Sequence, residues 1–86
     1  MSQQDGDWRL QGQEDYLFGV TLKFQKYAPY SETWTHDHCE FCWIRFIVTP
    51  YDDYSVTEGF ATLDQYRWVC VTCFADFKER FQWIEQ

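Results

Sequence analysis

Hydrophobic and polar residues alternate most regularly over residues 20–25, Val-Thr-Leu-Lys-Phe-Gln. A period of two predicts a β-strand with one buried side and one solvent-facing side. Trp8 and Leu10 fit an earlier strand, and residues 12–15 between the two segments fit a turn. The pattern therefore predicts an N-terminal β-hairpin over residues 8–30.

The C-terminal part of the chain has a longer hydrophobic period. The apolar residues Phe74, Phe77, Phe81 and Ile84 are separated by three, four and three positions. Residues with this spacing lie on one stripe of an α-helix. Residues 72–84 are therefore predicted to form an amphipathic helix, with their charged residues mostly on the exposed side.

Shorter apolar runs between these two segments predict short antiparallel strands. Residues 43–48 are apolar apart from one arginine and include β-branched side chains, and a Thr-Pro pair ends the run. Residues 59–62 and 66–69 fit two shorter strands, whereas residues 30–37 and 51–55 are typical of loops. The chain is therefore predicted to have an α+β fold.

Length and composition limit this fold to one domain. The chain has 86 residues, and a domain of this size often needs a metal ion or disulfides for stability. Aromatic residues make up 22% of the chain, and each of them can bury a large apolar area. A few fill a small core, and others remain available for contacts with a partner. We predict a single domain over residues 1–86, in which residues 1–7 are frayed.

The formal net charge is −7, and most of it lies in one region. Residues 31–59 contain six acidic residues and one basic residue, which gives a charge of −5. This charge repels nucleic acids and anionic membranes and attracts basic partners. We therefore expect a basic protein partner, and we expect neither nucleic acid nor membrane as a partner.

The N-terminal residues suggest a cytoplasmic protein. Residues 1–12 are polar and carry acidic side chains, unlike a secretion signal, and no apolar segment approaches the length of a membrane span. Four cysteines without such a signal indicate a reducing compartment, in which thiols bind metal rather than form disulfides.

The four cysteines form two pairs with the spacing of metal ligands. Cys39-Glu-Phe-Cys42 and Cys70-Val-Thr-Cys73 are separated by 27 residues. A gap of two residues allows both thiolates of a pair to reach one metal ion from a tight turn, and four such ligands complete a tetrahedral structural zinc site. A single pair can be a redox dithiol, but neither pair lies in the βαβ pattern of that class. We predict one structural Zn²⁺ ion bound by all four cysteines.

The positions of the pairs predict how the zinc-binding core, residues 36–85, is arranged. The first pair precedes a predicted strand, and the second pair opens the predicted helix. A cysteine turn, a hairpin and a helix whose first turn supplies two ligands form a treble clef, in which the helix N-terminus favours negatively charged thiolates. Two cysteine turns on short hairpins would instead form a zinc ribbon. The predicted class is therefore a treble-clef or zinc-ribbon-like domain.

Two histidines, His36 and His38, lie beside the first pair. We expect them to hydrogen-bond the zinc thiolates or nearby backbone groups. In one alternative a histidine replaces a cysteine as ligand, and in another both histidines act with Asp37 in a metallonuclease site. A nuclease needs a positive surface to hold its substrate, whereas this chain is acidic. We therefore predict that the protein is not an enzyme.

Three segments carry a resemblance to a known group of proteins. They are His-Asp-His-Cys-Glu-Phe-Cys-Trp at residues 36–43, Glu-Gly-Phe-Ala-Thr at 58–62, and Tyr-Arg-Trp-Val-Cys-Val-Thr-Cys-Phe-Ala-Asp-Phe at 66–77. The chain resembles a group of small, mostly uncharacterised bacterial proteins with an H-D-H-C-E-F-C-W segment and a later W-[IV]-C-x-x-C-[FY]-x-D-F segment. The match spans residues 27–83. The resemblance implies a bacterial cytoplasmic zinc domain, similar in character to the immunity proteins of toxin systems.

These observations favour a module that binds another protein, most concretely an immunity-type inhibitor of a basic toxin or nuclease. The candidate contact residues are acidic and aromatic side chains in or beside the predicted loops: Tyr30, Trp34, Tyr51, Asp52, Asp53, Tyr54 and Glu58. The alternatives are a zinc finger that binds nucleic acid or regulates another protein, a metallonuclease-like enzyme, and a subunit of a larger assembly. The basic residues form no cluster in the sequence, which disfavours nucleic-acid binding.

Replacing Asp52 and Asp53 together by lysine is expected to weaken binding of the basic partner about tenfold and to reduce its salt dependence. The reason is that the substitutions reverse the charge of a predicted contact loop. Titrations at two salt concentrations measure both effects. Unchanged affinity with unchanged salt dependence would place the partner surface elsewhere.

Overall fold

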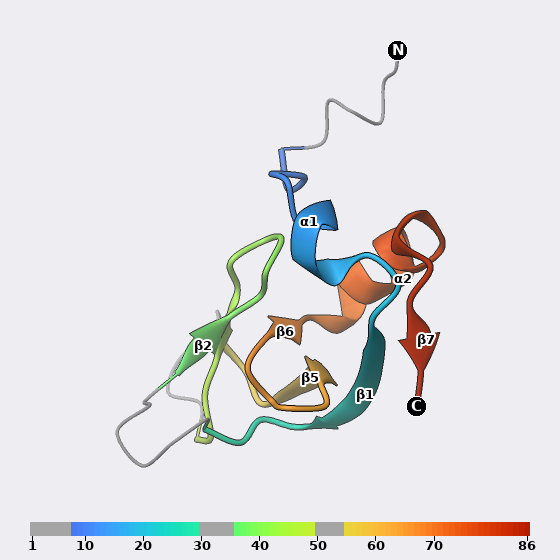
Figure 1. The fold of residues 1–86 in the computed structure, drawn as a ribbon. Helices are drawn as coiled ribbons and strands as arrows, with labels where there is room; N and C mark the ends of the chain where they lie inside the picture. The colour runs from blue at the N-terminus through green and yellow to red at the C-terminus, as the bar shows by residue number, and fades with distance from the viewer. Residues whose placement is uncertain (1–7, 30–35, 50–54) are drawn as a thin grey trace.

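The computed structural model describes residues 8–29, 36–49 and 55–86, and this part of the chain has an α+β architecture. Its elements are, in order, α1 (Glu14–Leu17), β1 (Thr21–Lys26), β2 (Asp37–His38), β3 (Arg45–Phe46), β4 (Ser55–Val56), β5 (Glu58–Thr62), β6 (Trp68–Val69), α2 (Val71–Phe81) and β7 (Ile84–Glu85). Figure 1 shows β1, β5 and β6 near the centre of the molecule, with β2 to one side and β7 to the other. The short strands and the C-terminal helix confirm the predicted α+β class.

The larger sheet has the strand order β6-β5-β1-β7. Strand β5 pairs antiparallel with both β1 and β6, which confirms the strands predicted near residues 20–25, 59–62 and 66–69. The last strand, β7, pairs parallel with β1. The two central strands therefore come from distant parts of the chain, and the sheet links the N-terminal half to the C-terminal half.

The predicted hairpin over residues 8–30 is wrong. Residues 8–13 form turns and bends that lead into α1, and the neighbours of β1 are β5 and β7. Trp8, whose apolar character suggested a strand, is 63% exposed. The helical turn instead buries Leu17 completely and leaves Gln13 only 2% exposed. Gln13 and Leu17 are four residues apart, so they share one face of a helix. The two-residue spacing of Trp8 and Leu10 instead suggested a strand.

Helix α2 ends at Phe81, before the predicted end at Ile84. Gln82 adopts a left-handed conformation (φ 52°), and its backbone N–H donates to the Glu79 carbonyl, which closes the helix. The chain then reverses, so that Trp83 is buried while Ile84 is 58% exposed in β7. Ile84 is therefore not part of the apolar stripe of the helix, and Trp83 contributes to the core in its place.

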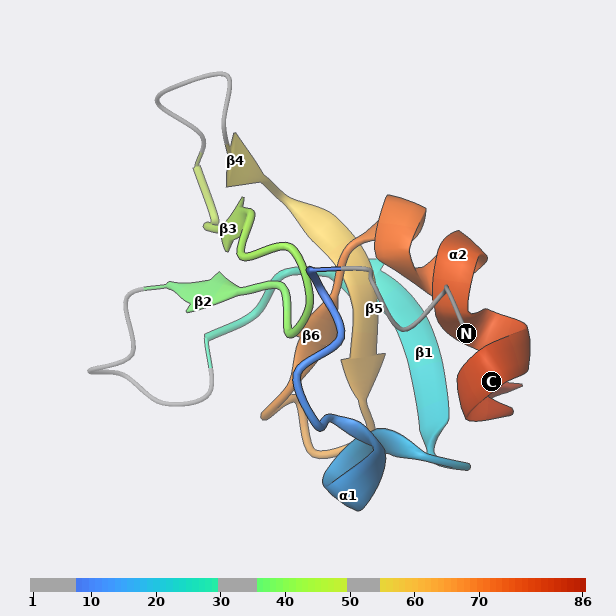
Figure 2. The ribbon, with the colours of Figure 1, turned by 90° about the horizontal axis from the view of Figure 1, so that it is seen from above.

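Helix α2 lies on one face of the larger sheet (Figure 2), and aromatic rings hold it there. The Phe74 ring of the helix stacks on the Phe60 ring of β5, with centroids 3.6 Å apart. The Trp83 ring stacks on Phe74 at 5.5 Å, and its Nε1 donates to the Leu17 carbonyl at 2.8 Å. This hydrogen bond ties α1 to the end of α2. Each buried ring removes a large apolar area from water, so these contacts stabilise the layer between helix and sheet.

The other face of the sheet is covered by aromatic side chains around Trp68. In the register of β5 and β6, Trp68 is opposite Ala61, so it points away from the Phe60 side. Trp68 has no exposed surface, and its ring lies 5.0 Å from the Tyr27 ring and 5.3 Å from the Phe46 ring. A second aromatic cluster therefore fills the space on this side.

Phe46 comes from a second, smaller sheet with the order β2-β3-β4. Strands β2 and β3 pair antiparallel, whereas β3 and β4 pair parallel. The strand predicted over residues 43–48 is thus limited to Arg45–Phe46. The prediction of antiparallel strands is confirmed for the pairings of β1 with β5, β5 with β6 and β2 with β3, whereas the pairings of β1 with β7 and of β3 with β4 are parallel.

Gly59→Ala is expected to lower the free energy of unfolding by about 1–3 kcal/mol, as overpacking a close-packed core does. A Cβ atom at this position would lie 2.6 Å from a ring carbon of Phe46 and 2.9 Å from the backbone carbonyl oxygen of Val69. Chemical denaturation measures the change, and Lys23→Ala on the exposed side of β1 is the control, with an effect within about 0.5 kcal/mol. Equal stability of the two variants would contradict the packing of Phe46 against β5.

Candidate metal centre

The first cysteine pair lies on a tight turn after β2. The Trp43 N–H donates to the Cys39 carbonyl at 3.2 Å, and the Cys39 N–H donates to the Ile44 carbonyl at 2.8 Å, so the chain reverses across the pair. Trp43 has φ 70°, a left-handed conformation that is uncommon for a residue other than glycine. The Phe41 N–H donates to Cys39 Sγ at 3.4 Å. The turn therefore supplies both a ligand pair and a backbone donor to one of the sulfurs.

The second cysteine pair stands at the start of α2. Cys70 is the N-cap residue, and its Sγ accepts the backbone N–H of Cys73 at 3.5 Å. The Cys70 N–H donates in turn to Cys39 Sγ at 3.4 Å. The N–H groups at a helix N-terminus favour negative charge, which stabilises thiolates at both positions of this pair.

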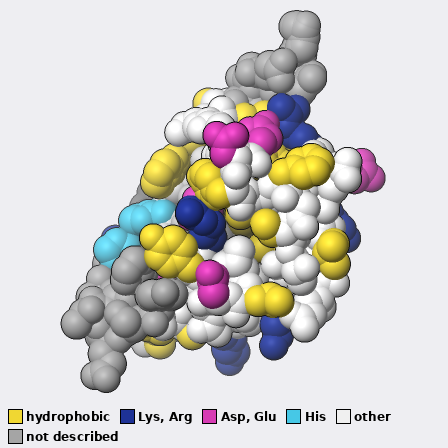
Figure 3. All heavy atoms as spheres, viewed as in Figure 1, with side chains coloured by type: hydrophobic (Ala, Val, Ile, Leu, Met, Phe, Trp, Pro, Cys, Tyr) yellow, Lys and Arg dark blue, Asp and Glu magenta, His cyan; other side chains and the backbone are white. Residues whose placement is uncertain are grey.

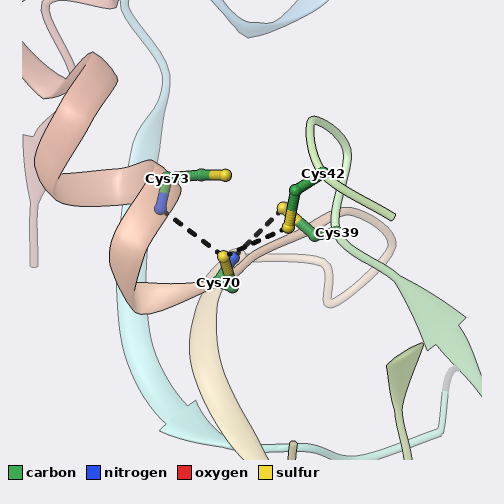
Figure 4. A group of neighbouring side chains, drawn as sticks. All are labelled: Cys39, Cys42, Cys70 and Cys73. Atoms are coloured by element: carbon green, nitrogen blue, oxygen red, sulfur yellow. Dashed lines mark hydrogen bonds between the residues drawn. The ribbon is translucent and has the colours of Figure 1, made fainter. Parts of the chain in front are cut away.

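Together the four cysteines have the geometry of a metal site. Their sulfur atoms all lie within 4.8 Å of one another. The Sγ atoms of Cys42 and Cys70 are 3.6 Å apart, close to the separation of about 3.8 Å that four sulfurs at about 2.3 Å from a tetrahedral Zn²⁺ ion would have. A disulfide would require about 2.05 Å. The four side chains gather between the cysteine turn and the start of α2 (Figure 4). Three of the cysteines are buried and Cys42 is half-buried, so the cluster can hold one metal ion largely out of solvent.

Backbone and ring contacts also join the first pair to the rest of the core. Cys39 forms a parallel bridge with Trp68, and the Glu40 N–H donates to the Trp68 carbonyl at 2.9 Å. Phe41, between the two ligands of the turn, has no exposed surface, and its ring lies 4.9 Å from the Phe77 ring of α2. The turn is therefore fixed against both β6 and α2.

Hydrogen bonds among the sulfurs shift their pKa values in opposite directions. Hydrogen bonds with Cys70 and then Cys73 hold the pKa of Cys39 well below its usual range. The hydrogen bonds with Cys39 raise the pKa values of Cys70 and Cys73, which opposes the loss of their protons. A bound metal ion displaces such protons, so metal affinity falls as the pH is lowered.

The group of neighbouring ligand atoms contains the four cysteines and neither histidine. The His36 ring lies edge-on to the His38 ring at 4.9 Å, and the His38 ring lies 6.4 Å from the Trp43 ring. Asp37, the third residue of the alternative nuclease site, accepts a hydrogen bond from the Tyr27 hydroxyl at 2.9 Å. Replacement of a cysteine ligand by histidine thus has no support in the described residues. Hydrogen bonds from the histidines to the thiolates stay a prediction.

The predicted partner surface falls mainly outside the described residues, where Tyr30, Trp34, Tyr51, Asp52, Asp53 and Tyr54 lie. The remaining candidate, Glu58, is exposed in β5, where it is opposite Lys26 of β1. The predicted partner surface therefore stays a hypothesis. Of its residues, the structure describes only Glu58, which is exposed.

Sequence reasoning missed three residues that contact the site: Arg9, Gln13 and Phe41. The Arg9 guanidinium donates to Cys73 Sγ at 3.6 Å, and the Gln13 side-chain amide donates to the Glu40 carbonyl at 2.9 Å. These two contacts join residues far apart in the sequence, so no local pattern predicts them. Phe41 did carry a signal, because an apolar residue inside a ligand turn needs a buried partner.

Comparisons with protein-family models, with curated proteins and with solved structures gave no match for this chain. In the part of the chain that the structure describes, neither helix has the length and apolar character required to cross a membrane. The metal centre is therefore assigned from its own geometry and residue types.

Titration with Co²⁺ is expected to saturate at one ion per chain and to produce the strong absorption of sulfur-to-cobalt charge transfer. Cys42→Ser should weaken binding at least about a hundredfold, because one of four ligands that together supply about 10–16 kcal/mol is lost. Thr72→Ser, between the two ligands of the second pair, is the matched control and should bind as the wild type does. Unaltered binding by Cys42→Ser would rule out a four-cysteine centre.

Proposed function

We propose that this protein is a zinc-stabilised module that acts by binding another protein, most specifically as an immunity-type inhibitor of a basic toxin or nuclease. The cysteine cluster supports zinc as the metal, since four thiolates form the ligand set of structural zinc sites. A centre closed by four sulfurs leaves no open position for a substrate, which favours a structural role. The succession of cysteine turn, short strands and ligand-bearing helix supports the treble-clef class.

The observation that carries the proposal is the number of large apolar side chains exposed on an acidic protein. The residues with 42–63% exposure are Trp8, Tyr16, Phe18, Phe24, Trp43, Val48, Leu63, Tyr66, Val71 and Ile84. Figure 3 shows hydrophobic side chains spread over one face, with basic and acidic side chains between them. Aromatic side chains are enriched at the centres of protein interfaces, so this surface suits contact with a protein.

Ion pairs within the protein neutralise much of its positive charge. Acidic partners lie within 4.0 Å of four basic side chains, in the pairs Arg9–Asp76, Arg67–Glu40, Lys78–Glu85 and Arg80–Glu14. The chain has only seven Lys and Arg residues in all. Few cations therefore remain to contact phosphates, while the net charge of −7 favours a basic partner. This charge distribution supports protein binding over nucleic-acid binding.

The proposal predicts that the tagged protein, mixed with a nuclease-treated extract of its own cells, retains one dominant basic protein in near-stoichiometric amount. Mass spectrometry identifies the retained protein, and raised salt should weaken the complex because the charges attract. Recovery of nuclease-sensitive material alone would contradict protein binding and favour the zinc-finger alternative.

Two matched variants then locate the contact surface on the purified pair. Trp43→Asn removes a 56% exposed aromatic ring beside the small sheet, and asparagine tolerates the left-handed backbone there. Ile84→Asn removes an equally exposed apolar side chain from β7 on the other side of the molecule (Figure 1). If Trp43 is an anchor, its replacement should weaken binding more than tenfold, with little effect from the Ile84 variant. The reverse order would place the interface on the β7 side.

A further inference from the structure

We infer that Arg9 is part of the metal centre and supplies the positive charge that offsets the excess negative charge of the four thiolates. Its role rests on the metal site proposed above, and it acts through Cys73 rather than by touching the ion. Arg9 Nη1 lies 3.6 Å from Cys73 Sγ, although the two residues are 64 positions apart in the chain. This contact assigns a function in the metal centre to the N-terminal segment.

A sulfur, a carboxylate and an aromatic ring all contact the Arg9 guanidinium and help to fix its position. Besides Cys73 Sγ, the same Nη1 atom donates to Asp76 Oδ2 at 2.9 Å. The guanidinium carbon also lies 4.5 Å from the centroid of the Phe77 ring, in the geometry of a cation–π contact. The side chain is only 18% exposed. A planar guanidinium suits this combination of a ring, a sulfur and a carboxylate, whereas a lysine ammonium presents a single point of charge.

Gln13 holds the backbone of Arg9 in place. Its side chain is 2% exposed, and Nε2 donates both to the Arg9 carbonyl at 2.8 Å and to the Glu40 carbonyl at 2.9 Å. Glu40 lies inside the turn of the first cysteine pair. The N-terminal segment therefore reaches the first pair through Gln13 and the second pair through Arg9, and it joins the two halves of the centre.

The charge of the centre explains why a cation is needed at this place. Four thiolates and one Zn²⁺ ion carry a net charge of −2, in surroundings where Cys39, Cys70 and Cys73 are buried. Backbone N–H groups donate to Cys39 and Cys70, whereas the donor at Cys73 is a full positive charge. Attraction between charges is strong where water is excluded, and Cys73 is 1% exposed. Asp76 also pairs with Arg9, but its carboxylate is 47% exposed and screened by solvent. It therefore neutralises the positive charge of Arg9 only in part.

The test compares Arg9→Gln and Arg9→Lys with the wild type, using zinc affinity in competition with a chelator. Loss of a residue that supports a metal ligand typically weakens metal binding about tenfold to a hundredfold, which is the loss we expect for Arg9→Gln. Arg9→Lys keeps the charge and should lose less. Arg80→Gln is the matched control, since Arg80 of α2 donates to a carboxylate, that of Glu14 in α1. Its affinity should stay within about threefold of the wild type.

The Co²⁺-loaded proteins separate a charge effect from a folding effect. A cation beside Cys73 stabilises the electrons of that thiolate, so removing it should shift the sulfur-to-cobalt absorption to lower energy in Arg9→Gln but not in Arg80→Gln. Equal zinc affinities for Arg9→Gln and Arg80→Gln, or a weakened Arg9→Gln with an unshifted band, would overturn the assignment of Arg9. Failure of the wild type itself to bind either metal would instead overturn the metal site.

Discussion

Four sulfur atoms from two distant segments lie within 4.8 Å of one another, and we propose that this meeting determines how the surrounding elements are placed. Cys39 and Cys42 lie on the turn after β2, whereas Cys70 and Cys73 lie at the start of α2. Cys39 is bridged to Trp68 of β6, and this strand leads directly into α2, so the turn lies beside the start of the helix. A metal ion bound by all four thiolates would link the small sheet, the larger sheet and the helix at one position. Without a metal ion, the four thiols are linked to one another only by weak hydrogen bonds between sulfur atoms.

Aromatic packing connects the cysteine cluster to the rest of the described chain. Phe41 extends from the cysteine turn into the cluster around α2, where its ring lies 5.3 Å from Phe81 and 5.8 Å from Trp83. Trp68 occupies the opposite face of the larger sheet, against Tyr27 and Phe46. The two clusters and the metal centre are therefore neighbours rather than independent units. A chain of 86 residues buries limited apolar area, so we expect its stability to depend on all three.

The elements that sequence patterns predicted well are those with a strong local signal. Strand β1 alternates cleanly, α2 carries an apolar stripe, and the paired cysteines have the spacing of metal ligands. The predicted hairpin at residues 8–30 does not form, because two apolar residues do not define a strand and the decisive contacts of that segment are the long-range ones of Arg9 and Gln13. Parallel pairing of β7 with β1 depends on the chain reversal at Gln82, which adopts a left-handed conformation without being glycine. Such contacts arise from tertiary packing, which local periodicity does not encode.

The central claim is that a single metal ion at the four cysteines organises the fold, and an NMR titration of the metal-free, reduced protein with Zn²⁺ tests it most directly. A series of ¹H–¹⁵N correlation spectra reports on every backbone amide as metal is added. We expect poorly dispersed signals without metal, and a single well-dispersed spectrum that is complete at one equivalent of Zn²⁺. A well-dispersed spectrum that is already complete without metal and does not change on addition of Zn²⁺ would contradict the account.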